Sequence, residues 1–121
     1  MGALVERHEQ VWIKVNAPVD RGIAQIVSIL NRLDGLRTLD SCEGIPSQTP
    51  AHIYFNYGDW RKIGALMFER IGPALWGRLG SDAVVSLEIF NASEPMGKLS
   101  FDKEATNMVA SLLDQLIYER P

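Results

Sequence analysis

The segment from Asp40 to Gly44 gathers a thiol, a hydroxyl, two carboxylates and a glycine in consecutive positions, with the sequence Asp-Ser-Cys-Glu-Gly. Glycine can adopt a left-handed backbone conformation and allows a ligand to approach the chain closely. Ser47, Gln48 and Thr49 follow and offer hydrogen-bond donors for a phosphate or a sugar. The alternative is a surface hairpin in which Gly44 only makes the turn. We treat this segment as a candidate ligand-binding loop.

A second arrangement could support catalysis. Cys42 ends one predicted strand and His52 begins the next, so the two residues could face each other across the hairpin. A thiol beside an imidazole is the minimum for nucleophilic catalysis, and Asp40 or Glu43 could orient the ring. However, no glycine-rich oxyanion turn is evident, and a small Cys in a strand usually serves packing. An enzyme that uses Cys42 and His52 is therefore the alternative to a binding protein without catalysis.

Metal-ligand residues are sparse in this chain. One Cys and two His cannot form a structural zinc site of the usual spacing. Asp40, Glu43 and Glu88 could hold a hard cation, but nothing in their spacing requires one. The sequence also lacks a Walker loop, a dinucleotide glycine fingerprint, a metalloprotease helix and a Gly-x-Ser-x-Gly elbow. We therefore expect neither a metal nor a cofactor.

Aromatic residues occupy two strands where they could stack on a base. Trp12 and Tyr54 correspond in position to the stacking residues of RNA-recognition sheets, although the Lys/Arg-Gly-Phe pattern is absent. The formal charge of −3 argues against general nucleic-acid binding, which depends on neutralising phosphates. A single nucleotide fits the same residues better. Its phosphates could meet Lys14, Arg37, Arg61 or Lys62.

The composition is that of one globular domain. The chain has 121 residues, of which 46% are hydrophobic and 22% charged. A single Cys excludes an internal disulfide, and no stretch approaches the length of a membrane span. No signal-peptide pattern is present, so we expect a cytoplasmic protein. We expect residues 1–10 to form a flexible tail and residues 11–121 to form a single α+β domain.

Apolar periodicity predicts the secondary-structure elements. Alternating or β-branched runs predict strands over residues 11–15, 36–42, 51–57, 83–90 and 98–101. Helical spacing predicts one helix from Pro18 to Gly35, a second that Asp59 caps, and a third from about Asp102. The second is expected to carry Ile63, Leu66, Met67 and Ile71 on one side, and the apolar stripe of the third includes Met108. Gly72-Pro73 is expected to break or kink the second helix. The loop over residues 43–50 is too long for a tight hairpin.

This order of elements matches a ferredoxin-like β-α-β-β-α-β core that is extended by a β-α unit. The helices are expected on one face of a mostly antiparallel sheet. The other face combines aromatic and charged residues, which suits an interface or a ligand floor. It is predicted to carry Trp12, Lys14, Thr38, Asp40, Cys42, His52, Tyr54, Asn56, Val84, Ser86, Glu88 and Phe90. A homo-oligomer that covers this face is favoured over an ordinary exposed sheet.

Two resemblances carry further expectations. Residues 12–20, 39–44 and 51–55, with the pattern VNAPVD…DSCEG, resemble small uncharacterised proteins of bacterial and bacteriophage genomes. Ser41-Cys42-Glu43-Gly44 is similar to the Ser-Cys-Ser-Gly segment of the wybutosine tRNA methyltransferase family. Here Glu43 replaces the second serine, the following arginine is absent, and the chain is much shorter. A bacteriophage origin would suit a protein that sequesters a nucleotide signal of host defence.

We therefore predict a non-catalytic protein that binds a small anionic or nucleotide-like ligand and acts as a homo-oligomer. An enzyme and a protein-interaction module that uses the exposed sheet face are the alternatives. The predicted ligand-binding residues are Trp12, Lys14, Asp40, Ser41, Cys42, Glu43, Gly44, Ser47, His52 and Tyr54.

Overall fold

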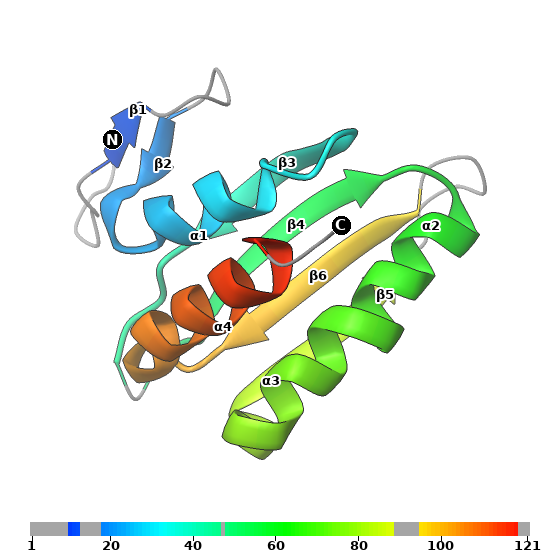
Figure 1. Cartoon of the computed structure of the whole chain (residues 1–121). Coiled ribbons are helices and arrows are strands. Elements are labelled where there is room, and N and C mark those ends of the chain that lie inside the picture. The colour runs from blue at the N-terminus through cyan, green and yellow to red at the C-terminus, as the bar shows by residue number, and fades with distance from the viewer. Residues whose placement is uncertain (1–9, 13–17, 47, 89–94, 119–121) are drawn as a thin grey trace.

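The computed structural model describes residues 10–12, 18–46, 48–88 and 95–118. Its centre is a four-stranded antiparallel sheet with the strand order β3-β4-β6-β5. The strands are β3 (Leu36–Cys42), β4 (Ala51–Tyr57), β5 (Ala83–Glu88) and β6 (Met96–Phe101). All the longer helices lie on one face of this sheet (Figure 1). The predicted α+β class, with helices on one face, is thus confirmed.

Strand β4 shows why the sheet has one covered face. Its residues alternate between buried and partly exposed, as a period of two requires when one face is packed. Ile53 and Phe55 are fully buried under the helices, whereas His52 and Tyr54 point to the other side. Gly97 of β6 lies opposite Phe55, and a Cβ there would come within 3.1 Å of Ile63 and of the Phe55 ring. The absence of a side chain therefore lets the helix pack closely on the sheet.

The first and last helices contribute the apolar stripes that the sequence predicts. The 3-10 turn η1 (Arg21–Ile23) leads into α1 (Ala24–Leu30), and η4 (Lys103–Ala105) leads into α4 (Thr106–Tyr118). The buried side chains of these segments include Ile23, Ile26, Val27, Leu30, Val109, Leu113 and Ile117. Met108, which was expected in the stripe of α4, is exposed. Helices α1 and α4 pack against each other through these apolar faces.

The helical segment after β4 is continuous through the Gly-Pro pair. It comprises α2 (Trp60–Gly64), the π-helical η2 (Ala65–Ile71) and α3 (Gly72–Leu79), and the short turn η3 (Gly80–Asp82) follows. As predicted, Asp59 caps its start and accepts hydrogen bonds from the backbone of Arg61 and Lys62. Of the two expected outcomes, a break or a kink, the break at Gly72-Pro73 does not occur. The backbone N–H of Gly72 donates to Met67 O, a five-residue step, so the helix widens just before the proline.

The prediction for the first strand and the start of the first helix is also wrong. Strand β1 (Gln10–Trp12) pairs with β2 (Pro18–Asp20), and the two form a separate antiparallel hairpin beside the main sheet (Figure 1). Pro18 and Asp20 are therefore part of a strand and not of the helix. Residues 13–17, including the rest of the predicted strand, lie outside the described residues. Helix α1 ends at Leu30 with Asn31 as its C-cap, so the predicted end at Gly35 is wrong as well. Gly35 lies in the turn before β3 and has a positive φ of 90°.

The strand order departs from the predicted ferredoxin-like order. That plan places the first strand in the centre of the sheet beside the third, but here β6 lies between β4 and β5. The main sheet is therefore built from two hairpin-like pairs, β3-β4 and β5-β6, joined through β4 and β6. Of the predicted flexible tail, residues 1–9 lie outside the described part, while Gln10 begins β1. No helix in the described part of the chain is long and apolar enough to cross a membrane.

Candidate functional site

The face of the sheet opposite the helices, here called the open face, carries two rows of side chains set by the strand register. One row crosses the sheet as Cys42, His52, Ser100 and Val84, because each is the direct partner of the next. The second row is Asp40, Tyr54, Lys98 and Ser86. Directly opposed residues in antiparallel strands point to the same side of the sheet. Four predicted ligand-binding residues, Asp40, Cys42, His52 and Tyr54, are thus brought together.

Tyr54 is the centre of this cluster. The Nζ atom of Lys98 lies 5.4 Å from the centroid of the Tyr54 ring, within the range of a cation–π contact. The His52 ring meets Tyr54 edge to face, with centroids 5.5 Å apart and planes at 68°. Lys98 was missed by the sequence analysis as a site residue. The signal that could have found it was the alternation of β6, which places it on the same face as Ser100.

Asp40 completes the charge pattern of the cluster. Its Oδ2 atom lies 3.9 Å from Nε2 of His52, so the two form an ion pair when the imidazole is protonated. The Asp40 side chain is 72% exposed and the His52 side chain 29% exposed, which keeps this contact in water. The open face therefore presents one aromatic ring between a cation and a His–carboxylate pair.

The register supports one part of the catalytic alternative. Cys42 is the direct cross-strand partner of His52, as the sequence suggested, and Asp40 Oδ2 lies 3.9 Å from Nε2 of the ring. Among the described residues, no hydrogen bond joins the Cys42 thiol to the imidazole. A nucleophile needs its base within hydrogen-bond reach, although such bonds are often looser before substrate binds. The pair is thus adjacent but not assembled into a catalytic dyad.

A β-bulge changes which residues of β3 reach the open face. The register shifts between Thr38 and Asp40, and this leaves Leu39 without a direct partner on β4. Thr38 was predicted on the open face, but it pairs with buried Phe55 and accepts a hydrogen bond from Asn31 on the helix side. Because of the extra residue, the side chains that precede it in β3 point to the faces opposite to those predicted. Arg37 therefore takes the open face.

Arg37 is held at the edge of the open face by Asn56. Its Nη2 atom donates to Asn56 Oδ1 at 3.1 Å, and Asn56 Nδ2 donates to the carbonyl of Pro95 at 3.1 Å. Arg37 was one of four cations proposed to meet phosphates. Of the three that the structure describes, Arg37 shares a face with Tyr54. Lys62 lies instead over the ring of Tyr57 on the helix side, with Nζ 4.6 Å from the centroid.

Only Asp40 and Cys42 of the predicted binding segment join this cluster. Ser41 pairs with buried Ile53 and so points to the helix side, while Cys42 points to the open face. The Glu43 carboxylate accepts hydrogen bonds from the backbone N–H of Gly22 at 2.7 Å and from Lys103 Nζ at 3.2 Å. Its side chain is only 13% exposed. Glu43 thus ties the start of α1 and of α4 to the sheet, which is a structural role.

Gly44 is required by the backbone, and its predicted role in ligand binding stays a prediction. Its φ is 77°, and a Cβ there would meet the backbone of Thr49 and Ala51 at 2.7 Å. The loop closes on itself, since Ile45 N donates to Thr49 O at 2.9 Å and Thr49 N donates to Ile45 O at 3.0 Å. The loop that joins β3 to β4 therefore contains a compact turn. A polar cavity of about 460 Å³ lies between it and residues 102–104, away from Tyr54.

Three of the predicted ligand-binding residues remain without a described side chain. Lys14 and Ser47 lie outside the described residues, and only the backbone of Trp12, in β1, is described. Their predicted roles stay predictions. Within the described residues, no three His, Cys, Asp or Glu side chains come together as a set that could hold a metal ion.

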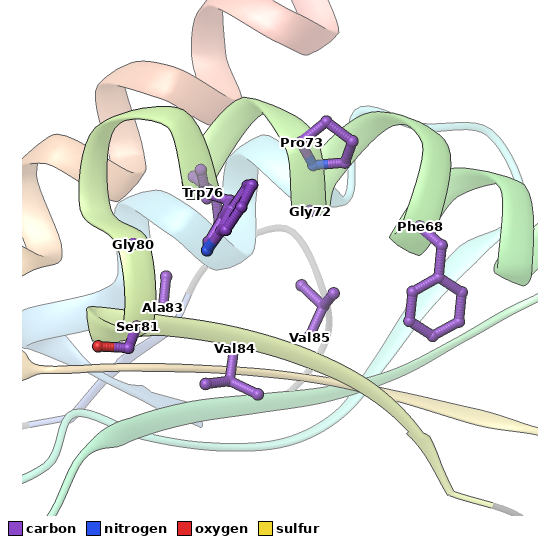
Figure 2. A pocket seen from close by; sticks show the side chains of 10 residues that line it. Phe68, Gly72, Pro73, Trp76, Gly80, Ser81, Ala83, Val84 and Val85 are labelled. Atoms are coloured by element: carbon purple, nitrogen blue, oxygen red, sulfur yellow. The ribbon is translucent and has the colours of Figure 1, made fainter.

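A second surface was not anticipated from the sequence. An apolar groove of about 620 Å³ lies between the helical segment η2-α3 and strand β5 (Figure 2). Its lining residues are Phe68, Gly72, Pro73, Leu75, Trp76, Gly80, Ser81, Ala83, Val84 and Val85. None of them is ionisable, so this groove offers shape and apolar area but no acid–base or nucleophilic chemistry.

The molecule thus has a polar-aromatic open face and a separate apolar groove at the β5 side of the sheet. Of these two surfaces, it is the open face that carries groups able to recognise charge. The two resemblances noted in the sequence stay predictions. Comparisons of the chain with protein-family models, curated proteins and solved structures found no significant match.

Proposed function

We propose that this chain is a non-catalytic binding protein that holds a small, planar, anionic ligand of the nucleotide type on its open face. The observation that carries the proposal is the surroundings of Tyr54: Lys98 Nζ lies 5.4 Å from its ring centroid, and His52 packs against its edge. A purine could stack on the aromatic pair, and Lys98 or Arg37 could meet a phosphate.

The charges of the cluster set a direction for the bound ligand. Asp40 disfavours a phosphate near His52, while Lys98 and Arg37 favour one on the β6 side or at the Asn56 end of β4. A nucleotide would therefore lie with its base toward His52 and its phosphate away from Asp40. A ligand-binding protein of this kind lowers the free concentration of its ligand, as expected of a sponge that sequesters a nucleotide signal.

The test is isothermal titration of the purified chain with a panel of mono-, di- and cyclic nucleotides. Tyr54→Ala should weaken binding roughly 5- to 150-fold, the equivalent of about 1–3 kcal/mol per stacked base. Tyr54→Phe keeps the ring and should bind nearly as tightly as the wild type. Failure of every nucleotide to bind, or equal affinities of wild type and Tyr54→Ala, would rule the proposal out.

A matched pair of variants tests the role of the Lys98 charge. Lys98→Met removes the charge beside Tyr54, whereas Arg61→Met removes an exposed charge from the start of α2. We expect weaker nucleotide binding and a smaller dependence on salt for the first variant only, because only Lys98 would contact phosphate. Equal effects of the two substitutions would indicate nonspecific attraction.

A Cys42–His52 enzyme is the second candidate, because the register places these residues directly opposite each other. Binding and catalysis are separated by Cys42→Ala. The binding proposal expects this variant to retain nucleotide affinity, since the thiol neither stacks nor carries the cation. If the wild type turns a nucleotide over and Cys42→Ala does not, the enzyme reading replaces the binding one.

A further inference from the structure

The apolar groove collects large side chains that the rest of the molecule leaves in water. Trp76 is 71% exposed, Val84 53% and Phe68 50%, and all three line this one groove. In Figure 2, Phe68 and Trp76 project from the helix on the side of β5, while Val84 and Val85 point to opposite faces of the strand. A contiguous apolar surface of this kind marks an interaction site more often than chance exposure.

The groove borders a strand at the edge of the sheet. Among the described strands, β5 pairs with β6 on one side only and forms one edge of the sheet. An edge strand presents a row of backbone donors and acceptors that another strand can satisfy. The occupant must therefore be an extended strand that also places apolar side chains against Trp76 and Phe68. A compact small molecule would meet only half of this requirement.

Charge narrows the choice of occupant. The protein has a formal charge of −3, so a contact between two copies costs least where the surface carries no like charges. The residues that line the groove include no acid and no base. A second copy of the chain can therefore approach at this surface without placing like charges in the groove. This second copy has both features that the occupant needs, an edge strand and an apolar helix surface beside it.

Symmetry then selects the pairing. In a two-fold arrangement of antiparallel strands, opposed residues share a face, so one residue must lie opposite its own copy. Centring on Val85 places Asp82 opposite Glu88, which are like charges. Centring on Ser86 places Val84 opposite Glu88. Centring on Val84 avoids both contacts and buries this exposed side chain against its copy.

We propose that the chain forms a two-fold symmetric homodimer in which the β5 strands pair antiparallel about Val84, with Trp76 and Phe68 buried across the seam. The four-stranded sheets of the two copies then form one continuous sheet. The helices stay on one face, and the open face of each copy stays free. This inference is independent of the proposed ligand, because no residue of the Tyr54 cluster takes part.

The first test is analytical ultracentrifugation of the full chain over a dilution series. The wild type should sediment at twice the 13.5 kDa chain mass. Trp76→Ser should raise the dissociation constant of the dimer roughly 30-fold or more, as truncation of an interface hot spot does. Val84→Lys should act likewise. Both side chains are exposed in the single copy, so the thermal melting of a fully diluted sample should be nearly unchanged.

Trp60→Ser is the matched control. Trp60 is 45% exposed at the start of α2 but does not line the groove, so its loss should leave the dimer intact. A wild type that is monomeric at every concentration would overturn the proposal. So would a dimer that survives Trp76→Ser and Val84→Lys, or one that dissociates equally with Trp60→Ser.

Disulfide trapping tests the pairing itself in a Cys42→Ala background. Val84→Cys should cross-link under mild oxidation, because opposed Cα atoms in antiparallel strands lie about 4.5–5.5 Å apart. Ser86→Cys should not, since the two copies of residue 86 would lie roughly 13 Å apart along the strands. Cross-linking of Ser86→Cys alone, or of neither variant, would overturn the pairing about Val84.

Discussion

Replacement of Gly44 by alanine tests whether the turn after β3 is held by backbone packing. Gly44 has a φ of 77°, and an added Cβ would lie 2.7 Å from Ala51 N and from Thr49 O. Both contacts are backbone atoms that cannot move freely, because Thr49 O accepts the hydrogen bond from Ile45 N and Ala51 is the first residue of β4. The substitution therefore combines a conformational cost with a steric one.

The magnitude follows from these two terms. An alanine in the left-handed region costs about 1–2 kcal/mol. Forcing an extra carbon into a filled space costs typically about 1–3 kcal/mol more. We therefore expect Gly44→Ala to lower the free energy of unfolding by roughly 2–5 kcal/mol, a large share of the total for a domain of this size. The sheet, including the Tyr54 cluster, should otherwise keep its register.

Gly35→Ala is the matched control for the conformational term. Gly35 has a φ of 90°, but the nearest atom to an added Cβ is the mobile Lys62 Nζ at 3.6 Å. The free energy of unfolding of Gly35→Ala should therefore be only about 1–2 kcal/mol lower than that of the wild type. The measurement is urea unfolding of both variants, followed by tryptophan fluorescence. Equal losses in the two variants would refute the steric part of the reasoning.

Two further predictions concern the helix that follows β4. Asp59→Ala removes the side chain that accepts hydrogen bonds from Arg61 N and Lys62 N, and we expect a loss of about 1 kcal/mol in urea unfolding. Asp59→Asn retains an acceptor and should lose much less; an equal loss would contradict the capping role. Gly64→Ala should raise the stability by about 0.5–1 kcal/mol, because Gly64 has helical backbone angles and no atom within 4 Å of an added Cβ. A lower melting temperature of this variant would show that the glycine serves a contact outside the described residues.

Local patterns determined most of the elements. The alternation of residues 51–57 predicted β4 with its correct bounds and faces, because a strand packed on one side needs a period of two. The apolar spacing after Asp59 predicted a capped helix with buried Ile63, Leu66, Met67 and Ile71. These predictions depend only on neighbours in the chain. The pairing of Cys42 with His52 was also within reach, since one hairpin joins them.

The failures share a different cause. The alternation of residues 11–15 predicts a strand but not its partner, and β1 pairs with β2 instead of entering the main sheet. The bulge beside Leu39 moved Thr38 away from the open face and brought Arg37 to it, although nothing in the local pattern marks an extra residue. The widened helix before Pro73 likewise depends on Gly72 reaching Met67 O. Each outcome is a choice among competing partners.

The sequence by itself determined an α+β chain with helices over one sheet face, a Cys–His pair across a hairpin and an aromatic at residue 54. Only the tertiary structure decided that β6 lies between β4 and β5. That single placement brings Lys98 beside Tyr54 and leaves β5 at the edge under Trp76 and Phe68. The physical reason is that hydrogen-bonded pairing between distant strands depends on which partner buries the most apolar surface. Periodicity within one segment does not contain this information.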